Sequence, residues 1–125
     1  MTYNFATGFH VFAGVLFPEG EGANKLRSQG SDRLRVLPMD VTSVEDVERV
    51  VSEIKHSELP LWALVNNAGI GFFVPFDWGN DVVDYQKIFE VNVFGLVRVT
   101  KQCIPLLRQS QGRIVNISSL AGKFQ

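Results

Sequence analysis

The sequence has few of the features that mark a secreted or membrane-spanning protein. Of its 125 residues only Cys103 is a cysteine, which rules out an intramolecular disulfide and fits a reducing compartment. The longest apolar run near the amino terminus covers residues 11–17, is interrupted by Gly14 and ends before Pro18. That run is too short for a membrane span, and no basic segment precedes it, so neither a membrane segment nor a signal peptide is predicted.

Clusters of like charge and of metal ligands are also missing. The formal net charge is -1 and no basic block occurs, so we expect no nucleic-acid partner. The two histidines, His10 and His56, do not stand in a metal-ligand pattern, and no metal site is predicted. The composition, 46% hydrophobic and 20% charged, is typical of a folded chain, and the length allows one domain.

Strand and helix patterns alternate along the chain. Strands are predicted at 9–13, 34–37, 61–65 and 113–117, and helices at 19–29, 44–54 and 81–109. Thr42 and Glu45 form a capping-box signature before the second helix, and Pro105 predicts a distortion in the third. Near-continuous apolar strands between helices favour an α/β fold, in which helices cover both faces of a parallel sheet.

Polar or small residues follow three of the predicted strands. Asp40 comes after the second strand, residues 66–69 (Asn-Asn-Ala-Gly) after the third, and Ser118 and Ser119 after the fourth. The carboxyl ends of parallel strands meet at one edge, where ligands bind, so the sequence predicts a ligand site there. The plainer alternatives are an ordinary Asn/Gly turn at 66–69 and serines that merely end a strand.

These motifs together resemble the short-chain dehydrogenase/reductase family. The resemblance rests on residues 66–69, on Asn92 in the following helix, and on Ser119 placed three residues before Gly122. Residues 8–14, 31–34 and 91–122 are similar to one branch, which holds retinol dehydrogenases, 17β-hydroxysteroid dehydrogenases and 3-hydroxybutyrate dehydrogenase. The resemblance implies a Rossmann-like doubly wound parallel sheet, with residues 1–125 forming part of a dinucleotide-binding domain.

The resemblance also implies which residues hold the cofactor. Asp40 would bind the adenine amino group and Val41 would lie beside the ring, while the cofactor cleft would be lined by Asn66, Ala68 and Gly69. The strand at 9–13 is followed by Gly14-Val15-Leu16, without an Arg or Lys for a 2′-phosphate. This favours NAD and leaves NADP open.

Two residues are predicted to be catalytic by the same resemblance. Asn92 would hold a water of the proton relay, and Ser119 would hydrogen-bond the substrate oxygen, with Ser118 as the other candidate. Asn92 has an alternative role as a satisfied amide, because it stands between Phe89 and Leu96 on an apolar helix.

Two parts of the family pattern are absent from the sequence. Phe12 stands where the Gly-rich phosphate turn has its middle glycine, so residues 7–14 are interpreted as the family's second strand. The Tyr-x-x-x-Lys motif, which supplies the general acid/base, is missing, because neither Tyr3 nor Tyr85 has a lysine four residues on. The chain is therefore expected to lack the first strand and the carboxyl-terminal part of the fold.

The missing first strand has a structural consequence, because in the family it lies between the second and fourth strands. We expect the strands at 9–13 and 61–65 to keep unpaired, apolar edges, and the chain to be marginally stable. A truncated isoform or an incomplete gene model would each explain why these two parts of the family fold are missing.

The predicted function is that of the central fragment of an NAD(P)-dependent oxidoreductase that interconverts an alcohol and a ketone or aldehyde. Aromatic residues at 72–76 favour an apolar substrate of the steroid or retinoid class, with 3-hydroxybutyrate left open and core packing as the alternative. Without the tyrosine and lysine the isolated chain is predicted to be inactive. The alternative is an interaction module that pairs through the helix at 81–109, through which the parent is expected to form homo-oligomers. An extended dehydrogenase or sugar-nucleotide epimerase is disfavoured by the motif at 66–69.

The location expected for the parent protein is intracellular, with the endoplasmic reticulum and mitochondria as candidates.

Overall fold

A computed structural model describes residues 8–29, 31–72 and 81–119 of the chain. In chain order the elements are β1 (Val11–Val15), α1 (Glu21–Arg27), β2 (Leu34–Pro38), α2 (Val44–His56), β3 (Ala63–Asn66), α3 (Val82–Phe89), the π-helix η2 (Glu90–Gly95), α4 (Leu96–Gln109) and β4 (Arg113–Asn116). The predicted alternation of strands and helices is confirmed, with boundaries shifted by at most two residues.

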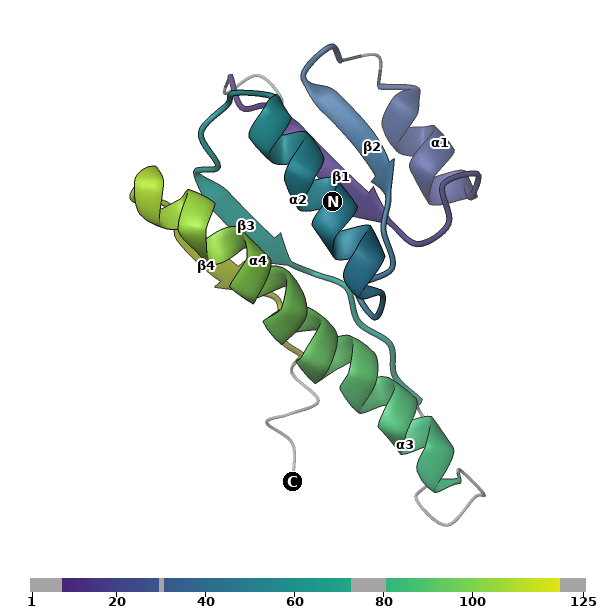
Figure 1. The fold of residues 1–125 in the computed structure, drawn as a ribbon. Coiled ribbons are helices and arrows are strands. Elements are labelled where there is room, and N and C mark those ends of the chain that lie inside the picture. The colour runs from purple at the N-terminus through teal and green to yellow at the C-terminus, as the bar shows by residue number, and fades with distance from the viewer. Residues whose placement is uncertain (1–7, 30, 73–80, 120–125) are drawn as a thin grey trace.

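The four strands form two separate parallel pairs. β1 pairs with β2 in a register that places Val11 opposite Leu34, and β3 pairs with β4 with Ala63 opposite Arg113. In the part of the chain that the structure describes, no ladder joins β1 to β3, although all four strands point the same way (Figure 1). The expected Rossmann-like α/β architecture is confirmed in this incomplete form, including the unpaired edges.

The hydrophobic core lies between α2 and α4. Val47 and Val51 of α2 pack with Val99, Cys103 and Leu107 of α4, and all five are at most 6% exposed. The apolar face of α2 buries Val47, Val50, Val51 and Ile54, while Val44, the first residue of the helix, is 46% exposed. Cys103, the single cysteine, is 2% exposed and belongs to this core.

Helix α2 begins one residue later than its capping signature predicts. Ser43 is the N-cap, and its Oγ accepts a 3.1 Å hydrogen bond from the Asp46 backbone N–H. The prediction that Thr42 caps the helix is wrong, because the Thr42 hydroxyl instead donates to Asp40 Oδ1 at 2.7 Å. The serine therefore satisfies the helix terminus, and the threonine is used to hold the preceding turn.

The long helical segment is distorted at a different place from the one predicted. Helix α4 runs through Pro105 without interruption, and the irregular turn is η2, at Glu90–Gly95. Gly95 is buried against Val41, and a Cβ there would lie 2.7 Å from Val41 Cγ2. Glycine weakens a helix locally, which fits an irregular turn at this position. Asn92 lies within this turn, and π-helical turns are frequent at functional sites.

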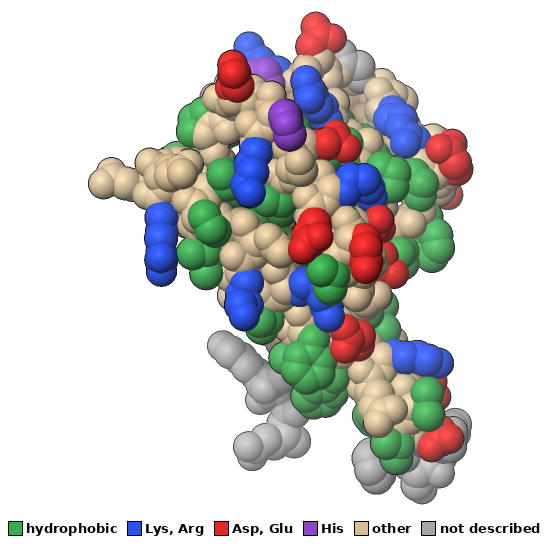
Figure 2. Space-filling model, in the orientation of Figure 1, with side chains coloured by type: hydrophobic (Ala, Val, Ile, Leu, Met, Phe, Trp, Pro, Cys, Tyr) green, Lys and Arg blue, Asp and Glu red, His purple; other side chains and the backbone are tan. Residues whose placement is uncertain are grey.

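The strand residues are poorly buried. No residue of the four strands is fully buried, and every position of β4 is exposed. Val65, Ile114 and Val115 are 41–48% exposed. Hydrophobic side chains also reach the surface around the lower part of the long helical segment in Figure 2. The side chains that are fully buried therefore belong to helices rather than to the sheets.

Candidate functional site at the carboxyl edge of the strands

Apart from Asn92, which lies in η2, the predicted site residues belong to three segments at the carboxyl ends of parallel strands. Asp40 follows β2, Asn66 is the last residue of β3, and Ser118 and Ser119 follow β4. The ends of β3 and β4 are level, because Asn66 is opposite Asn116 and the Ile117 N–H donates to the Asn66 carbonyl at 2.9 Å. The structure therefore brings the segments after β3 and β4 side by side.

Asn66 joins two strands and a helix. Its side-chain Nδ2 donates to Asn116 Oδ1 at 2.9 Å and to Thr100 Oγ1 at 3.0 Å. The Asn66 amide therefore ties the ends of β3 and β4 together. The partner on α4 is Thr100, which the sequence reasoning missed. Only its hydroxyl, next to the apolar Val99 in the sequence, could have marked it as a hydrogen-bonding position.

Asn92 fixes the loop that follows β3. Its Oδ1 accepts from the Ile70 backbone N–H at 2.9 Å, and its Nδ2 donates to the Ile70 carbonyl at 2.8 Å. Gly69 lies directly beneath, since a Cβ added there would be 3.5 Å from Asn92 Oδ1. The half-buried Asn92 amide therefore has its hydrogen bonds satisfied, as its alternative role predicts. The partner is the backbone of Ile70, directly after the Asn-Asn-Ala-Gly segment.

Asp40 stabilises a tight turn ahead of α2. Its Oδ1 accepts from the Thr42 N–H at 2.8 Å as well as from the Thr42 hydroxyl, and its own N–H donates to Asp46 Oδ2 at 2.9 Å. The hydrogen bond from Arg49, followed by the one from the Asp40 backbone, lowers the pKa of Asp46 below its ordinary value. The carboxylate of Asp40 is half-buried at the edge where the sequence predicts the adenine contact.

Val41 is fixed by an arginine that sequence reasoning missed. The Val41 carbonyl accepts from Arg98 Nη1 at 2.7 Å, and Arg98 Nη2 contacts Glu90 Oε1 at 2.8 Å. Arg98 therefore links the segment after β2 to both η2 and α4. No local pattern in the sequence predicts this contact, because Arg98 and Val41 are 57 residues apart.

The remaining predicted positions are exposed. Ala68, Gly69, Ser118 and Ser119 lie outside any helix or strand and face solvent. Small, exposed residues leave the backbone of this edge accessible to a ligand. The aromatic segment predicted to shape the substrate pocket begins at Phe72, which is 46% exposed, and its other residues lie outside the described part of the chain.

The glycine-containing segment near the amino terminus is not a phosphate turn. Residues 11–15 form β1, as the interpretation as a second strand predicts. A Cβ on Gly14 would clash with the Met39 side chain, so this glycine serves close packing between the ends of β1 and β2.

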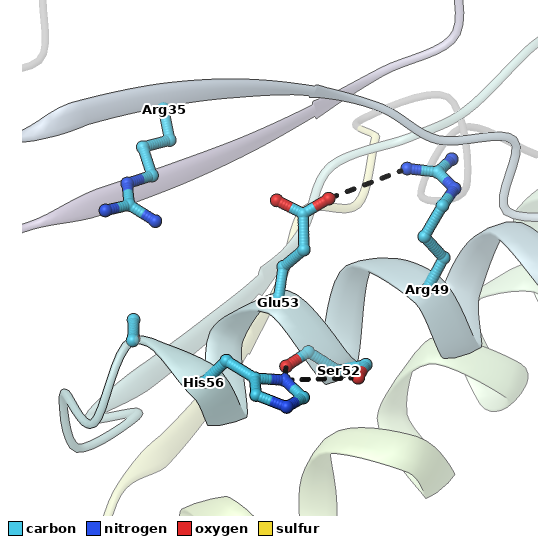
Figure 3. Close-up of a pocket in the computed structure, with 6 residues that line it drawn as sticks. Arg35, Arg49, Ser52, Glu53 and His56 are labelled. Carbon is cyan, nitrogen blue, oxygen red and sulfur yellow. Dashed lines mark hydrogen bonds and ion pairs between the residues drawn. The ribbon is translucent and has the colours of Figure 1, made fainter.

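Two surface hollows lie away from the predicted positions. The first is lined by Arg35 of β2 and by Arg49, Ser52, Glu53, His56 and Ser57 on and after α2 (Figure 3). Within it, Arg49 lies 4.0 Å from Glu53, and His56 Nδ1 lies 2.7 Å from the Ser52 carbonyl oxygen. The second hollow is more apolar and is lined by Val82, Tyr85, Gln86, Phe89, Glu90 and Phe94.

Within the described ranges, no group of three or more His, Cys, Asp or Glu residues is arranged to hold a metal ion. In the same part of the chain, no helix has both the length and the apolar character needed to cross a bilayer.

Sequence comparison relates the chain to proteins with named activities. The family model described as short chain dehydrogenase matches residues 4–125. Estradiol 17-beta-dehydrogenase 2 of Mus musculus is 49% identical over 120 residues, covering 92% of this chain and 31% of that protein. Mitochondrial D-beta-hydroxybutyrate dehydrogenase of Rattus norvegicus is 43% identical, covering 94% of this chain and 36% of that protein. The chain thus spans about a third of the length of these relatives.

Comparison with solved structures gives the same result for the fold. Serine dehydrogenase from Escherichia coli superposes with a TM-score of 0.83 at 25% identity, covering 97% of this chain and 55% of that one. NADPH-bound carbonyl reductase from chicken fatty liver gives a TM-score of 0.80 at 26% identity, covering 90% of this chain and 49% of that one.

Proposed function

Because the chain belongs to the short-chain dehydrogenase family, we propose that it is the central part of an oxidoreductase that uses NAD(P) to interconvert an alcohol and a ketone or aldehyde. The observation that carries the proposal is the convergence of Asn66, the Asn92-bound loop and Ser119 at one edge of parallel strands. On this proposal, residues 1–125 form part of a dinucleotide-binding domain.

The cofactor would be held by the segments after β2 and β3. Asp40 offers a carboxylate toward the adenine amino group, and Val41 is a fixed apolar neighbour for the ring. Asn66, Ala68 and Gly69 line the adjoining cleft, where small side chains let the ligand reach the backbone. When bound, the nicotinamide accepts or donates the hydride.

NAD is the proposed cofactor rather than NADP. No Arg or Lys occurs between Val15 and Asn24, where the chain leaves β1. Arg27 reaches this loop from the end of α1, but its Nη1 already donates to the Pro18 carbonyl at 2.5 Å and to Asn24 Oδ1 at 3.1 Å. These two bonds use part of the donor capacity of the guanidinium, which keeps its positive charge.

The catalytic contribution of this chain is divided between Ser119 and the turn that contains Asn92. The Ser119 hydroxyl would donate a hydrogen bond to the substrate oxygen and stabilise the charge that develops there. Both polar atoms of the Asn92 side chain are bonded to Ile70, so the relay water would be bound by the η2 backbone, while the side chain positions the loop. These 125 residues do not supply the proton donor, because no Tyr-x-x-x-Lys occurs in the sequence. We therefore propose that the isolated chain does not turn over substrate.

The proposed substrate class is apolar, with a steroid preferred. Estradiol and D-beta-hydroxybutyrate appear in the names of relatives at 49% and 43% identity, and the higher identity favours the steroid. The exposed Phe72 at the end of the predicted site loop is consistent with an apolar pocket wall. The mitochondrial relative supports an intracellular location, with mitochondria and the endoplasmic reticulum as the candidate compartments.

A second candidate function is association through the long helical segment. The hollow along α3 and η2 exposes Val82 (66%), Phe89 (57%) and Phe94 (53%) on one apolar surface. Contiguous apolar surface of this kind marks protein interfaces, which supports a homo-oligomeric parent or a catalytically inactive pairing module.

The test is a chimera in which residues 8–125 replace the matched segment of mouse estradiol 17-beta-dehydrogenase 2. We expect NAD-dependent oxidation of estradiol by this chimera. Ser119→Ala should lower kcat about 10²–10³-fold, as loss of one hydrogen-bond donor to a developing charge does. Ser118→Ala is the matched control and should retain most of the activity. A folded, active chimera in which Ser119→Ala has no effect would refute the assignment, and so would one in which only Ser118→Ala abolishes turnover.

A further inference from the structure

Arg98 makes two contacts that span the irregular turn η2. Its Nη2 lies 2.8 Å from Oε1 of Glu90, the first residue of η2, and its Nη1 donates to the Val41 carbonyl at 2.7 Å. Arg98 itself belongs to the first turn of α4, so the ion pair reaches across the whole of η2. Because the Arg98 side chain is only 22% exposed, its contacts are less screened by water than those of a surface arginine.

The π-helical geometry favours the ion pair between Glu90 and Arg98. Eight residues separate them, which is about 2.2 turns of a regular α-helix and would leave the two side chains out of line. Hydrogen bonds of a π-helix close after five residues rather than four, so each turn holds more residues. Eight residues that include η2 therefore come closer to two full turns, and the two side chains meet. The ion pair thus stabilises the irregular turn relative to a regular helix.

Val41 is held against the same turn by its side chain. Gly95 is the last residue of η2 and is buried, and a Cβ there would lie 2.7 Å from Val41 Cγ2. The valine therefore fits where a glycine leaves room, while Arg98 bonds its carbonyl. Asp40 precedes Val41 and accepts hydrogen bonds from Thr42, so the turn after β2 is attached to η2 through Val41.

The loop after β3 is attached to η2 as well. Asn92, inside η2, accepts from the Ile70 N–H at 2.9 Å and donates to the Ile70 carbonyl at 2.8 Å. Val41 and Ile70 follow different strands, and both are bonded to side chains of one continuous helical stretch. A shift of η2 must therefore change contacts on both segments.

We propose that Arg98 is a positioning residue that couples the segment after β2 to the loop after β3 through η2. The inference rests on the proposed function, in which Asp40 and Val41 bind adenine and the loop lines the cofactor cleft. Adenine bound at Val41 would fix the Arg98 contacts and so favour the turn geometry in which Asn92 holds Ile70. Occupancy at one end of the cofactor site would thereby be linked to order at the other end.

The first test needs no ligand and measures amide hydrogen exchange in the isotope-labelled 125-residue chain. Arg98→Met keeps an apolar stem but removes both polar contacts. We expect about tenfold faster exchange at the Thr42 and Ile70 amides, relative to the amides of the buried faces of α2 and α4. Arg108→Met, at an exposed position of the same helix, is the control and should change neither amide.

Two results of this first test would overturn the coupling. One is unchanged exchange at Ile70, and the other is acceleration of all amides by a common factor, which would show only general destabilisation. Glu90→Gln is a milder variant that decides the matter if Arg98→Met does not fold. It keeps the size of the side chain and an acceptor oxygen but removes the charge, so Ile70 exchange should become about threefold faster. Unchanged exchange at Ile70 in Glu90→Gln would then overturn the proposal.

The second test adds AMP, which carries the adenine half of the proposed cofactor. In the wild type, saturating AMP should shift the amide resonances of Val41 and Thr42 and also the side-chain NH₂ resonances of Asn92. In Arg98→Met the shifts at Val41 and Thr42 should remain, whereas the Asn92 shift should fall below about a third of its wild-type size, because the connecting contacts are lost. Equal Asn92 shifts in the two chains at saturation would overturn the coupling.

Failure of the proposed function gives a different result. If AMP shifts neither Val41 nor Thr42 in the wild type, the adenine site is refuted, and the coupling of cofactor ends with it. If AMP shifts both amides and the Asn92 response does not depend on Arg98, the adenine site stands and only the role of Arg98 is refuted.

Discussion

The side-chain Nδ2 of Asn66 lies 2.9 Å from Asn116 Oδ1, across the ends of two parallel strands. The same nitrogen reaches Thr100 on α4, so one amide connects the sheet edge to the helix that covers it. The Asn66 side chain therefore stabilises the structure around the candidate site.

Replacing Asn66 should destabilise the chain. Asn66→Ala removes both hydrogen bonds and leaves Thr100 and Asn116 without this partner, which should lower the free energy of unfolding by about 1–3 kcal/mol. Urea unfolding measures this change. Asn67→Ala, at the exposed neighbouring position, is the control and should stay within about 0.5 kcal/mol of the wild type. Equal effects of the two substitutions would show that the amide link is unimportant for stability.

Asn92 is expected to act on the loop through Ile70. Asn92→Ala should speed hydrogen exchange of the Ile70 amide by about tenfold, because the acceptor for that N–H is lost. Asn92→Asp keeps an acceptor oxygen and should retain most of the protection, although its carboxylate cannot donate to the Ile70 carbonyl. Similar exchange rates in both variants would contradict the positioning role.

Two glycines in helical segments should respond in opposite ways to alanine. In Gly95→Ala the new Cβ would meet Val41 Cγ2 at 2.7 Å, and strain in this packed turn should lower stability by about 1–3 kcal/mol. Gly22→Ala in α1 meets nothing within 4 Å and should stabilise by about 0.5 kcal/mol, because alanine has the higher helix propensity. Thermal melts of the two variants decide this, and an unchanged Tm in Gly95→Ala would mean that Val41 can move aside.

The Cys103 thiol gives stability a defined dependence on alkaline pH. Burial raises the pKa of Cys103 from 9.0 to about 11. The unfolded chain therefore loses this proton first, so the contribution is complete below pH 9.0 and is lost as the pH rises toward about 11. The full loss amounts to about 2–3 kcal/mol. Urea unfolding across this range should show a shallower decline for Cys103→Ala, and parallel declines would contradict the assignment.

Association through α3 and η2 should be sensitive to charge on its apolar surface. Phe89→Glu places a carboxylate among Val82 and Phe94, where desolvation in an interface would be costly, so the variant should sediment as a monomer at concentrations at which the wild type pairs. Ser52→Glu, on the exposed side of α2, is the control and should leave association unchanged. A wild type that remains monomeric throughout would exclude this surface as the contact.

The parts of the fold that the sequence predicts well are those determined by local pattern. Regular spacing of Val47, Val50, Val51 and Ile54 identifies the buried face of α2, and short apolar runs identify all four strands. The level ends of β3 and β4 follow from their parallel direction. Family resemblance adds the expectation of unpaired edges on β1 and β3, and in the part of the chain that the structure describes the strands form two separate sheets.

Contacts between distant residues were not predictable in the same way. The Arg98 bond to Val41 and the Asn92 bonds to Ile70 join positions 57 and 22 residues apart, and hydrophobic periodicity carries no information about such pairs. The sequence predicts a distortion at Pro105 because proline is a conspicuous local signal, whereas the structure has the irregular turn at Glu90–Gly95. Close packing of Gly95 on Val41 becomes visible only once the chain is folded.

Trp62 lies where it can serve as a fluorescence probe of the contact between the two strand pairs. Its indole lies between the Phe9 ring, at 5.3 Å, and the Arg113 guanidinium, at 3.9 Å from the ring centroid, where the amino ends of the two strand pairs meet. A change in the separation of these pairs must alter the polarity and packing around the indole. The chain therefore carries an intrinsic fluorophore at the junction, whose emission can report in real time whether the two strand pairs separate or close.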